Sequence, residues 1–99
     1  MGNRREYSIK ISLNQRRFTS LVIDPHYEKN HPDITDQIIL ELVKQLEGTE
    51  SDPEDEKDGF AYFARELRLN EKTYRVVITY CDEPFLGIVN AFRVREKKI

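Results

Sequence analysis

Apolar and polar side chains alternate along residues 6–13. The odd positions from Tyr7 to Leu13 are apolar, and the even positions between them are serine or lysine. This period of two is typical of a strand with one buried face. A polar connection of hairpin length follows, and residues 18–23 are rich in β-branched side chains. The pattern therefore predicts an N-terminal β-hairpin.

The spacing becomes helical after this hairpin. Asp24-Pro25 ends the second strand and predicts only a short helical turn, because Pro32 disfavours the α conformation at the residue before it. The main helix is expected to begin at residues 33–35 and to end at Gly48. Its apolar residues are spaced by 4, 1, 3, 1 and 3 positions, which gives a single stripe. The stripe consists of Ile34, Ile38, Ile39, Leu42, Val43 and Leu46.

Three further strands are predicted at residues 60–69, 73–81 and 85–94. Short turns join them, so each is expected to be antiparallel to the next. The preceding residues 49–58 are acidic and contain a proline, which predicts a mobile loop. We therefore expect residues 1–99 to form a single α+β domain with the order β-β-(short α)-α-β-β-β. In this fold a mostly antiparallel five-stranded sheet has the helix packed on one face.

The composition limits the class of protein and its location. The chain has 99 residues, close to the commonest size of one domain. Its one cysteine, Cys81, excludes an intramolecular disulfide. It contains no apolar run of about 18 residues, and its N-terminus lacks the apolar segment of a signal peptide. We therefore expect a cytoplasmic protein with no membrane partner.

Charge is unevenly distributed along the chain. The net charge of −2 argues against a simple nucleic-acid binder. Residues 1–20 carry a net +4, residues 21–58 a net −9 and residues 59–99 a net +3. If the two basic ends of the chain pair in one sheet, their basic residues lie together and form a positively charged surface. The alternative is that the charged segments are ordinary solvated surface with no binding role.

Each of the last three predicted strands carries an arginine. Arg65, Arg75 and Arg93 could converge on neighbouring strands, and convergent guanidinium groups require an anion between them. A phosphate is the expected guest. The alternative is that each arginine pairs with a carboxylate, such as Glu66 or Glu71, or lies in solvent.

The two histidines, His26 and His31, are the candidate acid–base groups, because imidazole titrates near neutral pH. Their spacing of five does not place them on one helical face, and no cysteine or carboxylate cluster completes a metal site. We therefore expect no metal ion. The alternative is that both histidines cap and pack a turn.

The segment from His26 to Arg95 resembles the small bacterial ribonuclease-toxin-like domains of the barnase, colicin and RelE/ParE-like assemblage. The resemblance rests on a histidine before the main helix, an acidic insert and three strands that include residues 74–78 and 86–93. It implies that His26 or His31 acts as the acid or base and that the three strand arginines hold the phosphate. The nucleic-acid contacts that it implies are Tyr80, Asn90 and Arg95.

Three functions stay open on the sequence alone. The first is a metal-independent endoribonuclease, which would activate a ribose 2′-hydroxyl and would need no cofactor. The second is a non-catalytic protein-interaction or regulatory module that binds a protein through an edge strand or through the acidic loop. The third is a nucleic-acid-binding domain that binds RNA without cleaving it.

Overall fold

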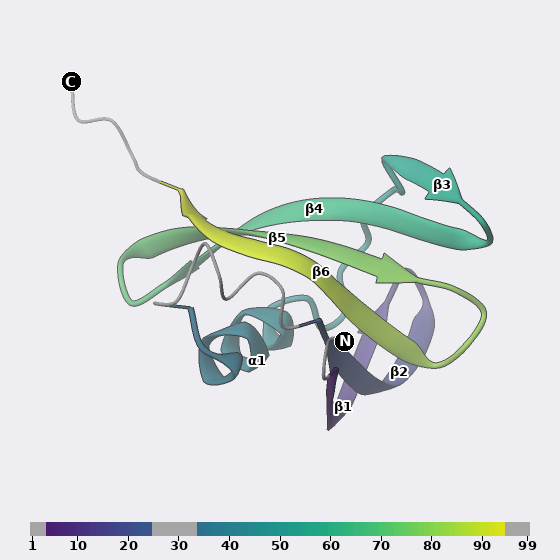
Figure 1. Cartoon of the computed structure of the whole chain (residues 1–99), viewed down its shortest axis with the longest axis horizontal. Helices are drawn as coiled ribbons and strands as arrows, with labels where there is room; N and C mark the ends of the chain where they lie inside the picture. The colour runs from purple at the N-terminus through teal and green to yellow at the C-terminus, as the bar shows by residue number, and fades with distance from the viewer. Residues whose placement is uncertain (1–3, 25–33, 95–99) are drawn as a thin grey trace.

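The computed structural model describes residues 4–24 and 34–94 (Figure 1). Six strands and one helix follow one another along these residues. The elements are β1 (Arg5–Leu13), β2 (Arg16–Ile23), α1 (Asp36–Lys44), β3 (Asp55–Lys57), β4 (Phe60–Leu69), β5 (Lys72–Tyr80) and β6 (Phe85–Val94). The short helical turn predicted after Pro25 lies outside the described residues.

The predicted fold class is wrong, because the sheet has six strands and is mixed. Its order is β1-β2-β6-β5-β4-β3. Strands β2 and β6 pair in parallel over residues 20–23 and 85–88 and so join the N-terminal hairpin to the C-terminal strands. This pairing links segments that are distant in sequence. No short turn joins the two strands, so the local sequence does not predict that they are neighbours. The sixth strand, β3, forms within the acidic stretch for which we predict a mobile loop.

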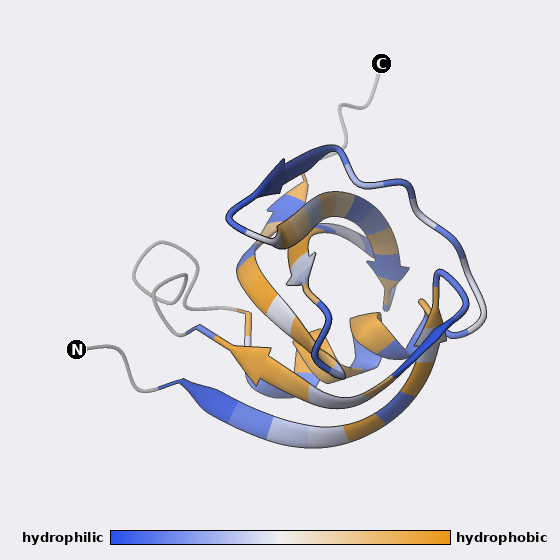
Figure 2. Ribbon diagram, turned by 90° about the vertical axis from the view of Figure 1, so that its right-hand side faces the viewer, coloured by the Kyte–Doolittle hydropathy of each residue, from blue (hydrophilic) through white to orange (hydrophobic). Residues whose placement is uncertain are grey.

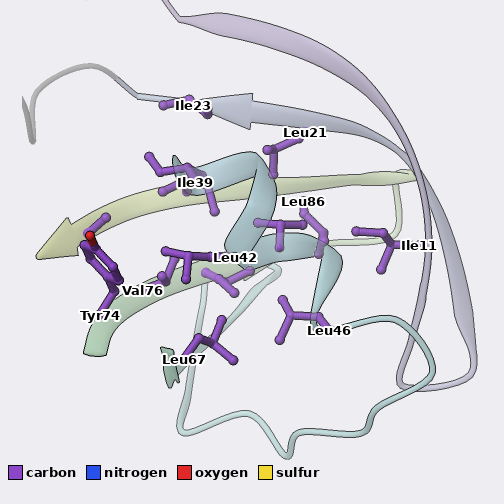
Figure 3. Close-up of a cluster of buried hydrophobic side chains, with 14 of the residues drawn as sticks. Ile11, Leu21, Ile23, Ile39, Leu42, Leu46, Leu67, Tyr74, Val76 and Leu86 are labelled. Carbon is purple, nitrogen blue, oxygen red and sulfur yellow. The ribbon is translucent and has the colours of Figure 1, made fainter. Parts of the chain in front are cut away.

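The sheet curls around α1 instead of presenting one flat face to it (Figure 2). Eighteen side chains from the helix, the strands, Ile34 before the helix and Leu46 after it form one buried cluster, part of which Figure 3 shows. In that view Ile39, Leu42 and Leu46 of the helical segment lie among the strand residues Leu21, Val76 and Leu86. The predicted apolar stripe of the helix therefore packs against the concave side of the curved sheet.

Two-residue turns join three of the strand pairs. Asn14 and Gln15 link β1 to β2, and Asn70 and Glu71 link β4 to β5. All four have positive φ values, as a type I′ turn requires. Asp58-Gly59 joins β3 to β4 in the same way and is a strong hairpin signal in the sequence.

The start of the helix is fixed by a capping residue and by contacts with β1. Thr35 is the N-cap, and its Oγ1 accepts a hydrogen bond from the Ile38 amide at 3.3 Å. Arg5 and Tyr7 of β1 both donate to the Asp36 carboxylate in the first helical turn. Beyond the helix the chain reaches Gly48, where φ is +74°. No helix among the described residues has the length and apolar character needed to cross a bilayer.

Segment 48–51 then runs beside the tip of the first hairpin. The Gly48 amide donates to the Ser12 carbonyl at 2.7 Å, and the Asn14 amide donates to the Thr49 carbonyl at 3.1 Å. The predicted acidic loop is thus held to β1 at its start and forms β3 near its end.

Candidate functional sites: an edge groove and a hairpin-end network

The three strand arginines do not all lie on one face of the sheet. Arg65 pairs across strands with Val76, and Arg93 with Tyr74, so both arginines begin on the face that carries the buried core. Arg75 pairs with Glu66 and is on the opposite face. Cross-strand neighbours share a face, so the structure does not bring Arg75 together with the other two.

The surroundings of these arginines also differ. Nη1 of Arg75 lies 3.3 Å from Oε2 of Glu66, which is the carboxylate pairing that the sequence left open. Arg93 is exposed. Arg65 is half-buried and donates from Nη1 to the Ser51 hydroxyl at 2.6 Å. Only Arg65 is therefore part of a network of polar side chains.

The other predicted site residues are distributed as follows. His26, His31 and Arg95 lie outside the described residues. Asn90 is half-buried on the outer face, opposite Val77, and its Oδ1 accepts a hydrogen bond from the next backbone amide at 2.9 Å. Tyr80 lies on the inner face at the end of β5 and takes part in the network that contains Arg65.

This hairpin-end network joins Arg65 to Tyr80 through two further residues. The Ser51 amide donates to Oδ1 of Asn14 at 2.6 Å, and Nδ2 of Asn14 donates to the Tyr80 hydroxyl at 3.1 Å. The Arg16 guanidinium lies over the Tyr80 ring, 5.5 Å from its centroid. A continuous line of contacts therefore runs from Arg65 through Ser51, Asn14 and Tyr80 to Arg16.

Aromatic packing fixes the ring of Tyr80 within this network. Its centroid is 5.8 Å from that of Phe18 and 6.1 Å from that of Phe63, both with edge-to-face geometry. Arg16 also lies 5.3 Å from the Phe18 centroid. Packing against aromatic rings therefore positions the Tyr80 hydroxyl and the Arg16 guanidinium, and such support is what a preorganised binding site requires.

A separate groove of about 510 Å³ lies between the edge strand β1 and the helix. Its strand side is formed by residues 8–11. Its helix side is formed by Gln37, Leu40 and Lys44, which are spaced by three and four positions and so share one helical face. Leu40 is only half-buried, in contrast to the neighbouring Ile39, which is fully buried.

The sequence interpretation missed most residues of both sites. Leu40 falls off the apolar stripe of the helix, and an apolar residue on the polar side is a signal that was available. No such signal marks Asn14, Arg16 or Ser51. Segment 48–51, which contains Ser51, lies beside the first hairpin only in the folded chain.

Within residues 4–24 and 34–94, no three side chains of histidine, cysteine, aspartate or glutamate are grouped so that they could hold a metal ion. Comparison with known proteins adds no relative: no family model, no curated protein and no solved structure matches the chain.

Proposed function

We propose that this protein is a non-catalytic binding module that accepts an extended peptide along β1, in the groove between β1 and α1. The observation that carries the proposal is the combination of an edge strand with an apolar groove beside a helix. Added strands gain affinity from backbone hydrogen bonds and specificity from pockets for alternate side chains. A groove of about 510 Å³ has room for several such side chains.

The two edges of the sheet differ in how well they are protected. The edge strand β3 has three residues, Asp55–Lys57, all of them charged and exposed. Short, charged edges resist the addition of another strand. The opposite edge strand, β1, has nine residues. On its outer side, the backbone contacts within the described part of the chain lie at its C-terminal end, where Leu13 bridges to Thr49 and Ser12 forms hydrogen bonds with Glu47 and Gly48. The longer and less protected edge is the one that lies beside the groove.

The groove favours a peptide in which acidic and apolar residues alternate. Ile9, Ile11 and Leu40 supply its apolar surface, and Lys10 and Lys44 supply positive charge. Lys44 pairs with Glu41 at 3.3 Å, but its side chain is 70% exposed. An exposed pair of this kind contributes little, so the ammonium can exchange that partner for a peptide carboxylate.

A synthetic peptide tests the proposal directly. The probe is a fluorescently labelled nonapeptide of alternating glutamate and valine, and binding to the full chain is measured by fluorescence anisotropy. We expect saturable binding and shifts of the backbone amide NMR signals of residues 8–11. The same peptide with proline at its centre should not bind, because proline cannot donate the required hydrogen bond.

A pair of leucine variants locates the binding site. Leu40→Asp places a negative charge in the groove and should weaken binding at least about tenfold, which corresponds to about 1.4 kcal/mol. Leu69→Asp changes another partly buried leucine that packs against the core and does not line the groove, so it should leave the affinity unchanged. Equal weakening by both variants, or shifts that fall outside β1 and α1, would refute the proposal.

Ribonuclease activity stays a prediction from the sequence. Incubation of the purified chain with RNA and a chelator measures it independently of peptide binding. Cleavage that is lost in the double variant His26→Ala, His31→Ala would establish the catalytic alternative and would contradict a purely non-catalytic role.

A further inference from the structure

The hairpin-end network contains more hydrogen-bond donors than acceptors. Arg65 is half-buried, and its guanidinium donates to the neutral hydroxyl of Ser51. Arg16 is also half-buried and lies against two aromatic rings. Among the described residues no carboxylate forms an ion pair with either arginine. Partial burial of a charge costs free energy that an anionic partner can offset, and here the described part of the chain supplies no such partner.

The hydroxyl groups add further donors. The Tyr80 oxygen accepts from Asn14, and the Ser51 oxygen accepts from Arg65, so each O–H hydrogen is directed away from those bonds. Both donors of the Asn14 amide are already used, on the Ser51 carbonyl and on Tyr80. What remains around the network is therefore two cations and two hydroxyl donors.

The nearby carboxylates do not neutralise these arginines. Oε2 of Glu54 accepts from the Ala64 amide at 3.2 Å, and Oε2 of Glu50 accepts from the Gln15 side chain at 3.4 Å. Both carboxylates belong to exposed residues. Their charges are screened by solvent, whereas the two half-buried guanidinium groups are screened less.

From this excess of donors we infer that the hairpin-end network binds a phosphate group, held by Arg65 and Arg16 with the Tyr80 and Ser51 hydroxyls. A phosphate accepts several hydrogen bonds at once and carries the charge that two arginines need. Two of these residues, Arg65 and Tyr80, are predicted site residues, but the site differs from the predicted one because Arg16 and Ser51 replace Arg75 and Arg93. This inference is independent of the peptide groove.

NMR titration of the full chain with sodium phosphate, at constant ionic strength, tests the inference. We expect saturable shifts of the Ser51 and Asn14 backbone amides. Arg65→Gln should raise the Kd at least about tenfold, because it removes a charge-assisted pair. Tyr80→Phe keeps the packed ring and should raise the Kd about fivefold. Arg75→Gln, on the opposite face, is the matched control and should leave the Kd unchanged.

A second arm distinguishes the sources of the phosphate. A single-stranded RNA hexanucleotide is titrated into the same samples. If RNA binds and inorganic phosphate displaces it, the site binds the phosphates of the nucleic-acid backbone. If only inorganic phosphate saturates the site, the site binds a small ion. Both results support the inference. Linear shifts without saturation for both probes, or equal effects of Arg65→Gln and Arg75→Gln, would overturn it.

Discussion

Asn14 and Ser51 are joined by two hydrogen bonds that run in opposite directions. Nδ2 of Asn14 donates to the Ser51 carbonyl at 2.8 Å, and the Ser51 amide donates to Oδ1 of Asn14 at 2.6 Å. One asparagine side chain thus satisfies both backbone groups of a residue 37 positions away. This pair fixes the first hairpin against segment 48–51 and thereby holds Arg65 and Tyr80 in one network.

Replacement of Asn14 by glycine should therefore destabilise the fold. Glycine keeps the positive φ of 54° without strain, so the loss combines the missing side-chain hydrogen bonds with the greater entropy of glycine in the unfolded chain. We expect the free energy of unfolding to fall by about 1–3 kcal/mol, measured by urea denaturation. Asn70→Gly is the matched control, because Asn70 occupies the same turn position with a φ of 53°. A loss as large for Asn70→Gly as for Asn14→Gly would show that the side-chain bonds contribute nothing.

Tyr7 and Asp36 connect β1 to the start of α1. The Tyr7 hydroxyl donates to Oδ2 of Asp36 at 2.5 Å, and Arg5 donates to both carboxylate oxygens. The hydrogen bond from Tyr7 to Asp36 is the main cause that raises the pKa of Tyr7 above its ordinary value of 10.0. Burial and the negative charge of Asp36 raise it further, and Arg5 offsets part of the rise.

This raised pKa predicts a stability change at alkaline pH. The folded state holds the Tyr7 proton more tightly than the unfolded state, so the contribution is fully present below the unfolded pKa of about 10. It is lost as the pH rises through the folded pKa. The difference in unfolding free energy between the native chain and Tyr7→Phe should therefore be constant up to about pH 9 and should shrink above pH 10. Asp36→Asn should remove the same alkaline slope, and a slope that persists in both variants would contradict the assignment.

Local patterns predict five of the six described strands and miss β3. The alternation at residues 6–13 and the strand at 85–94 correspond closely to β1 and β6, and the helical stripe identifies the core face of α1. These features depend on side-chain period and on turns of a few residues, which are local properties. The parallel pairing of β2 with β6 depends on contacts between distant segments, so the predicted five-stranded antiparallel sheet is wrong.

The candidate sites show the same division between local and distant information. Strand alternation alone does not show that Arg65 and Arg75 lie on opposite faces, because residues on two antiparallel strands can be compared only when the register between the strands is known. Asp58-Gly59 is a hairpin signal in the sequence. The acidic residues before it favour a loop instead, so the pattern does not predict the hairpin of β3 and β4. The partners of Arg65 were not readable, because Ser51 reaches it only in the folded chain.

A strained turn offers a stabilising change. Glu71 has a φ of 67°, and an L-residue with a side chain adopts this conformation at a cost. Glu71→Gly should relieve that cost and raise the free energy of unfolding by about 0.5–1 kcal/mol, after the greater entropy of glycine in the unfolded chain is included. Lys72→Gly, one position later at the start of β5, is the control and should destabilise by a similar amount. A decrease for Glu71→Gly would show that the turn is not strained at this position.

Gly87 and Thr79 are cross-strand neighbours on the outer face, where they line a hollow of about 320 Å³. A Cβ atom added at Gly87 would lie 2.9 Å from Cγ2 of Thr79, too close for two carbon atoms. The threonine cannot rotate freely, because its Oγ1 donates to the Ala61 carbonyl at 3.0 Å. Gly87→Ala should therefore lower the free energy of unfolding by about 1–3 kcal/mol. Thr79→Ser removes Cγ2 and keeps the hydroxyl, so Gly87→Ala should cost much less in that background. A double-mutant cycle measures this coupling, and additive effects would show that the cost arises elsewhere.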